Sequence, residues 1–133
     1  MFRHALRALP IAVLSMIPAA AQAGVPAEIA QQFRFVNDAV EASESETGYC
    51  QNGARDDFSY SANARCADAY GRLLRELRSR DQVIERMIAE RRGTLSAEDL
   101  AETERRHGQL HQLIDAVLKF YNLFTARKGS ATY

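Results

Sequence analysis

The chain has 133 residues, with 17 basic and 17 acidic side chains and therefore no formal net charge, and 47% of its residues are hydrophobic. This length allows one small domain with a single modest core. The charge balance argues against nucleic acid or an anionic membrane as an electrostatically bound partner.

The first 23 residues have the composition of a secretory signal peptide. Two arginines lie among the first seven residues, residues 8–20 are almost entirely apolar, and the next three residues, Ala-Gln-Ala, have the small-x-small form that signal peptidase cleaves. The apolar stretch is short for a membrane span and contains two prolines. We therefore expect residues 1–23 to be removed, which leaves residues 24–133 as one periplasmic or secreted domain without a stable membrane anchor.

A short first helix is predicted over residues 26–42. Pro26 suits a first helical turn, and apolar residues then recur at spacings of four, three and four, namely Ile29, Phe33, Val36 and Val40. Beyond residue 42 several serines, Gly48 and the Asn52-Gly53 turn dipeptide interrupt this pattern. We therefore predict a loop between the first helix and the second.

Cys50 and Cys66 are the two cysteines of the chain. An even number of cysteines in an exported protein predicts a disulfide. An intermolecular bridge and a reactive thiol pair are the alternatives, but the spacing is not that of a redox motif. The bridge would close the predicted loop and add about 3 kcal/mol of stability in the chain-entropy model.

Two long helices are predicted over residues 62–92 and 97–128, separated by a turn at residues 93–95. In each helix mostly apolar residues recur at alternating spacings of three and four. When the chain turns back at residues 93–95, these positions on one helix come to lie opposite those on the other. Facing pairs are Tyr70 with Tyr121, Leu77 with Ile114, Arg80 with Leu110, and Ile84 with His107. The predicted fold is all-α: an antiparallel, coiled-coil-like helical hairpin with the short N-terminal helix, forming a three-helix bundle with one disulfide.

His107 and His111 form the strongest metal-binding pattern in the sequence. Two imidazoles four residues apart on a helix can hold one metal ion, and Glu104 lies one turn earlier on the same side. The alternative is that His107 fills a packing position and His111 lies on its flank near Ser79 and Arg80. Asp81 and Glu85 are assigned to an ordinary charged surface, because they alternate with arginines along their helix.

Three further residues are candidates for partner binding. Phe58 and Tyr60 belong to the region of residues 48–60, where a loop on a rigid scaffold could present them to another protein. Arg80 occupies a packing position, where it would pair with Glu76 or Asp115, fix the helix register, or meet an anion or a partner's carboxylate.

The distribution of charge also bears on partners. Residues 24–59 contain 2 basic and 7 acidic side chains, whereas residues 62–92 contain 8 basic and 5 acidic ones. The acidic segment could lie against the basic helix of the same chain, or either could face a partner. Apolar residues beside the predicted packing face also need cover from the first helix or from a homodimer.

No catalytic motif appears in the sequence, and no nucleophile is paired with a base in a recognised pattern. We therefore expect a non-enzymatic protein without a cofactor, acting by contact with an envelope protein as an adaptor, chaperone-like factor, inhibitor or secretion accessory. A periplasmic metal-binding protein that uses the histidine pair is the alternative.

Overall fold

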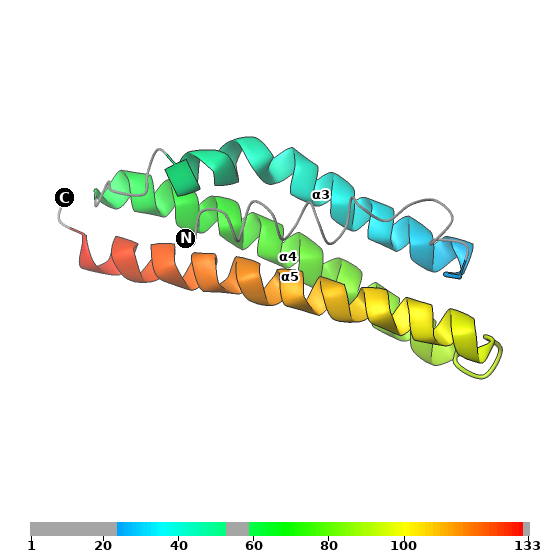
Figure 1. Cartoon of the computed structure of the whole chain (residues 1–133). Coiled ribbons are helices and arrows are strands. Elements are labelled where there is room, and N and C mark those ends of the chain that lie inside the picture. Colours follow the sequence, from blue (N-terminus) through cyan, green and yellow to red (C-terminus); the bar gives the residue numbers. More distant parts are fainter. Residues whose placement is uncertain (1–23, 53–58, 132–133) are drawn as a thin grey trace.

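The computed structural model describes residues 24–52 and 59–131 (Figure 1). Within these ranges the chain forms α3 (Ala27–Asn52), α4 (Tyr60–Arg91) and α5 (Ala97–Ser130), and no strand. The all-α prediction with three helices is therefore confirmed. The predicted signal peptide lies outside the described residues. None of the described helices is long and apolar enough to cross a membrane.

The ends of α4 and α5 follow local sequence signals. Ser59 caps α4 by accepting a hydrogen bond from the backbone N–H of Ala62, and Ser96 caps α5 by accepting one from the backbone N–H of Asp99. These bonds satisfy amides that have no partner within the helix. Acidic residues in the first turn of α5 and basic residues in its last turn also favour the helix dipole.

The first helix is longer than predicted, because it continues past residue 42 to Asn52. The prediction of a loop over residues 43–52 was therefore wrong. Ser43 and Thr47 donate hydrogen bonds to carbonyls of the preceding turn at 2.8 and 3.0 Å, so these polar side chains satisfy themselves within the helix. Burial of Cys50 and Gln51 also stabilises the last turns of this helix, and such tertiary contacts outweigh a weak local helix propensity.

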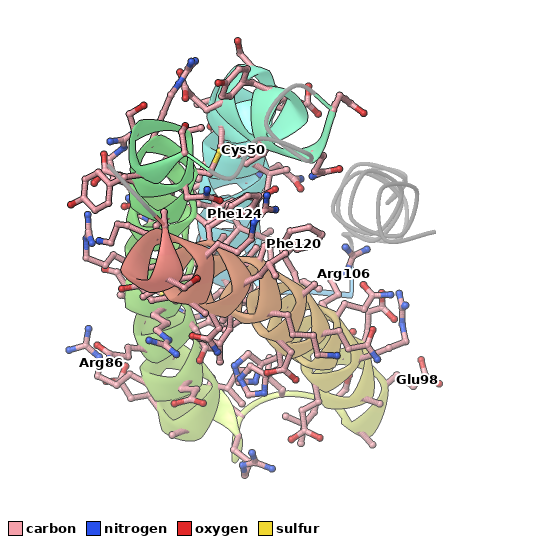
Figure 2. The ribbon with its side chains drawn as sticks, turned by 90° about the vertical axis from the view of Figure 1, so that its left-hand side faces the viewer. Cys50, Arg86, Glu98, Arg106, Phe120 and Phe124 are labelled. Atoms are coloured by element: carbon pink, nitrogen blue, oxygen red, sulfur yellow. A yellow bond between two sulfur atoms is a disulfide. The ribbon has the colours of Figure 1, made fainter. Side chains whose placement is uncertain are left out.

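Helices α4 and α5 lie side by side and run in opposite directions (Figure 1). The Tyr70 ring stacks on the rings of Phe120 and Phe124, with centroids 5.3 and 5.7 Å apart. Figure 2 shows both phenylalanines pointing into the space enclosed by the helices, whereas Arg86 and Glu98 point outward. Residues beside the packing face are buried as well, namely Leu74, Ile88, Leu113 and Phe120.

Helix α3 packs mainly on α4 and contributes its apolar face to the common core. Ion pairs join the two helices near both ends: Glu28 of α3 meets Arg91 of α4, and Glu46 meets Arg65 at 3.0 Å. The acidic segment therefore faces the basic helix of its own chain. The pairs are exposed to solvent, so they add little to the stability of the fold.

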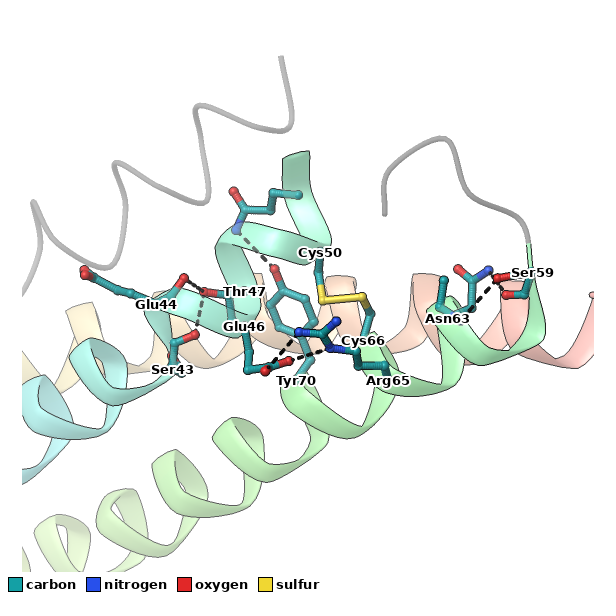
Figure 3. The surroundings of a disulfide bond; sticks show 12 residues. Ser43, Glu44, Glu46, Thr47, Cys50, Ser59, Asn63, Arg65, Cys66 and Tyr70 are labelled. Atoms are coloured by element: carbon teal, nitrogen blue, oxygen red, sulfur yellow. Dashed lines mark hydrogen bonds and ion pairs between the residues drawn. A yellow bond between two sulfur atoms is a disulfide. The ribbon is translucent and has the colours of Figure 1, made fainter. Parts of the chain in front are cut away.

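The predicted disulfide joins α3 to α4 (Figure 3). Cys50 and Cys66 are fully buried, with their Cα atoms 5.6 Å apart. Next to the bridge, the Gln51 side-chain amide donates a hydrogen bond of 3.1 Å to the Tyr70 hydroxyl. Burial raises the pKa of Tyr70 to about 12. A covalent bond and a buried polar contact thus hold the same point of the bundle.

Candidate metal centre

Four potential metal ligands from two helices meet on one side of the α4–α5 pair. Asp81 and Glu85 are one turn apart on α4, and His107 and His111 are one turn apart on α5. Residues at this spacing share a helix face, so the packing of α4 on α5 brings the two pairs together. One ligand atom from each side chain lies within 4.8 Å of the others.

The shortest contacts converge on the Asp81 carboxylate. Its Oδ1 atom lies 2.6 Å from Nε2 of His107 and 2.9 Å from Nε2 of His111. The Glu85 carboxylate lies farther from the same nitrogens, at 3.9 and 3.6 Å. Both imidazole rings thus present Nε2 to the same oxygen atom, and their centroids are 4.3 Å apart.

The Asp81 contacts have hydrogen-bond distances, and the group as a whole is close to the spacing that a tetrahedral metal ion requires. Ligands held at about 2.0–2.1 Å from zinc are separated from one another by about 3.3–3.4 Å. The four His–carboxylate separations, 2.6, 2.9, 3.6 and 3.9 Å, lie on both sides of that value. Each separation would have to change by less than about 1 Å to reach that value. The donor set of two imidazoles and two carboxylates matches zinc and neighbouring divalent transition metals.

The four ligands differ in exposure. The side chains of Asp81 and His107 are 16% and 15% exposed, whereas those of Glu85 and His111 are 54% and 49% exposed. The exposed side opens on a cleft of about 410 Å³. The cleft is lined by Glu85, Ile88, Ala89, Arg92, Glu104, His107, Gly108 and His111. A metal held here would have solvent on one side and packed helix on the other.

The predicted ligand Glu104 lies in the wall of this cleft but has a different partner. Its carboxylate is 2.8 Å from the Arg92 guanidinium, and it is not a member of the converging group. The structure thus brings His107 and His111 together with Asp81 and Glu85 and leaves Glu104 in an ion pair.

A signal for the two missed carboxylates was present in the sequence. The predicted register places His107 opposite Ile84, and Asp81 and Glu85 are the acidic residues that flank Ile84 on α4. The alternation of these carboxylates with arginines along α4 favoured the interpretation that they belong to an ordinary solvated surface. Reading the register across both helices, instead of charge along one helix, would have found the group.

The three candidates for partner binding are not brought together at one site. Arg80 is partly buried, forms an ion pair of 3.0 Å with Glu76, and lies 4.6 Å above the ring of Phe35. Its pairing with Glu76 agrees with one of the expected partners. Tyr60 begins α4, and Phe58 lies outside the described residues.

Comparisons with protein-family models, with curated proteins and with solved structures find no match to this chain. A functional hypothesis for the protein therefore has to come from its own side chains. Within the described residues, the converging histidines and carboxylates are the group with the most specific chemistry.

Proposed function

We propose that this protein binds a divalent transition metal, with zinc as the reference ion, through Asp81, Glu85, His107 and His111. The observation that carries the proposal is the convergence of four ligand atoms from two helices within 4.8 Å. Each helix contributes two ligands from one face, and the helix packing fixes both faces before a metal arrives. Binding in this form is non-catalytic and needs no organic cofactor.

The proposal includes the export of the protein to an oxidising compartment. The Cys50–Cys66 disulfide supports it, since such bonds persist in secreted and periplasmic proteins. The signal-like composition of residues 1–23 supports it independently. In this proposal the mature chain is the single domain 24–133, and α4 and α5 interlock like an antiparallel coiled coil.

Contact with an envelope protein, or with a second copy of the chain, is a second proposal with less support. Two of the features that favoured it are satisfied within the chain, because the acidic segment forms ion pairs with α4 and most of the flanking apolar residues are buried. What favours it in the structure is Leu123, a large hydrophobic side chain that is 46% exposed near the end of α5.

Metal binding is tested by calorimetric titration of zinc into the mature, chelator-treated protein. We expect one ion per chain, and we expect Asp81→Asn, His107→Ala and His111→Ala each to weaken binding by at least about 10- to 100-fold. That is the range for the loss of a group that merely supports a ligand. Glu104→Gln is the matched control: it removes a carboxylate from the cleft wall, and the affinity should stay unchanged.

A thermal measurement checks the same proposal without relying on binding heat. At zinc concentrations about 100 times the dissociation constant, the folded state gains about 2.7 kcal/mol, which raises the Tm by roughly 10 °C. At the same zinc concentration the His107→Ala variant, with an affinity about 10- to 100-fold weaker, should gain only about 1.4 to 0.4 kcal/mol, so its Tm should rise by about half as much or less. An equal rise in this variant, or a loss of binding in Glu104→Gln alone, would contradict the site.

A further inference from the structure

The exposed side of the metal centre carries an inference that rests on the proposed function. We infer that the bound metal accepts one more ligand from outside the chain, through the cleft between α4 and α5. The chemistry of the cleft favours a neutral nitrogen donor of the imidazole type. A free small molecule or a histidine of another protein could supply that donor.

The first observation is the uneven burial of the protein ligands. Asp81 and His107 form a deep pair at about 15% exposure, and Glu85 and His111 form a shallow pair at about half exposure. Zinc sites that exchange ligands hold three protein ligands with an open fourth position and can expand to five ligands. With four protein ligands here, an outside donor would bind by that expansion. Here the shallow pair and the cleft lie on the same side, which leaves room for a fifth ligand.

The second observation is Gly108. It follows His107 directly in the sequence, precedes His111, and lines the cleft. A glycine inside a helix costs about 0.5–1 kcal/mol relative to alanine. At Gly71 packing accounts for it, because an added Cβ would lie 3.1 Å from the Tyr121 ring. At Gly108 an added Cβ would meet nothing within 4 Å, so packing does not account for it. The missing side chain leaves the cleft open beside the metal ligands.

The third observation concerns charge. A divalent ion and the carboxylates of Asp81 and Glu85 sum to zero, and Arg92 and Glu104 in the cleft wall neutralise each other. Ile88 and Ala89 add apolar surface. An anionic ligand would therefore bring an unbalanced charge into a partly desolvated cleft, which is unfavourable. A neutral, flat ring with one nitrogen donor meets no such cost.

The test uses the mature protein loaded with Co²⁺, because zinc has no visible absorption. Imidazole is added and the ligand-field bands are followed, since their intensity falls when cobalt goes from four to five ligands. We expect a saturable decrease in wild type and a much weaker response to azide, the anionic probe. Acetyl-Gly-His-Gly amide distinguishes the two sources, because only an accessible cleft admits a histidine carried on a chain.

A pair of variants decides whether the cleft is the route. Gly108→Leu should fill the cleft and weaken imidazole binding by at least about tenfold, a shift in free energy of about 1.4 kcal/mol, with unchanged cobalt affinity. Gln112→Leu places the same leucine side chain one turn farther along α5, at an exposed position outside the cleft lining, and should respond like wild type. Circular dichroism confirms that both variants fold.

The outcomes separate this inference from the proposed function. Absence of cobalt binding in wild type would overturn both. Cobalt binding without a response to imidazole, an equal or stronger response to azide, or equal imidazole binding in Gly108→Leu and wild type would overturn the inference alone.

Discussion

The region around the disulfide and the region around the histidines share helix α4, which pairs with α3 at the first and with α5 at the second, but they are built differently. Near Cys66, the rings of Tyr70, Phe120 and Phe124 are buried and stacked, and the Gln51 side chain is buried with them. Near Asp81, carboxylates and imidazoles converge at the surface, and half of the group is open to solvent. One helix thus serves a packed region and a ligand-bearing region.

The difference shows how a small bundle can carry a polar site without losing its fold. Four charged or titratable side chains brought together contribute little net stability at a half-exposed surface. The packed region, the disulfide and the α3–α4 contacts hold the helices in register regardless. We therefore expect stability to depend on the packed region and metal binding to depend on the histidine region, with little coupling between them.

Removal of the disulfide should have the largest effect on stability. The variant Cys50→Ala/Cys66→Ala should lose about 3 kcal/mol, because the bridge closes a loop with a sequence separation of 16 residues. A loss of this size lowers the Tm by roughly 12 °C or more. Urea unfolding of the double variant against wild type measures the change.

The same variant tests whether the two regions are independent. Cys66 and Asp81 are about 22 Å apart along α4 at ~1.5 Å per residue. Zinc affinity, measured well below the melting temperature, should therefore match wild type within about threefold, or roughly 0.6 kcal/mol. A large loss of affinity would show that the disulfide fixes the ligand geometry and that the comparison is wrong.

Much of the fold could be predicted, because helix formation here follows periodicity and capping. The two long helices begin and end within about two residues of their predicted bounds, which is the usual uncertainty of a helix end. The extension of the first helix to Asn52 could not be predicted, since it depends on burial of Cys50 and Gln51 against other helices. Local composition does not encode such contacts.

The site was only half predictable, for a related reason. The spacing of His107 and His111 is a property of one helix, whereas their partners Asp81 and Glu85 become neighbours only when two helices pack. Arg106 is another example: it is fully buried, its Nε lies 3.2 Å from Glu102, and burial lowers its pKa. Arginine is rarely buried, so its sequence position gives no hint of this environment.

Titration of Tyr70 gives the next largest effect and should be confined to the packed region. Burial raises its pKa from 10.0 to about 12 in the folded state. Between these values the unfolded chain has lost the proton and the folded chain still holds it, so stability falls as pH rises. The fall should be on the order of 2 kcal/mol between about pH 10 and about pH 12, measured by urea unfolding.

Tyr70→Phe removes the titrating group and should flatten this alkaline decrease. At neutral pH the variant should lose about 1–2 kcal/mol, because the buried Gln51 amide loses its hydrogen-bond acceptor. Tyr121→Phe, which changes a partly exposed tyrosine of α5, is the control for removing one phenol. An equally steep alkaline decrease in Tyr70→Phe would assign the effect to another group.

Gly71 and Gly108 provide the finest test of the comparison, because one helical glycine lies in each of the two regions. Gly108→Ala should stabilise the protein by about 0.5–1 kcal/mol, since alanine favours the helix and the new Cβ meets no neighbour within 4 Å. In Gly71→Ala the same gain is opposed by a contact of 3.1 Å with the Tyr121 ring. We expect Gly71→Ala to be no more stable than wild type.

Paired urea denaturation of the two variants measures this difference, which should be about 1 kcal/mol in favour of Gly108→Ala. Zinc affinity should be unchanged in both, because neither glycine is a ligand. Equal stabilisation by both substitutions would mean that the packed region yields to an added methyl group as easily as the open cleft. A loss of stability in Gly108→Ala would mean that the cleft is as tightly packed as the disulfide region, and the contrast between the two regions would then fail.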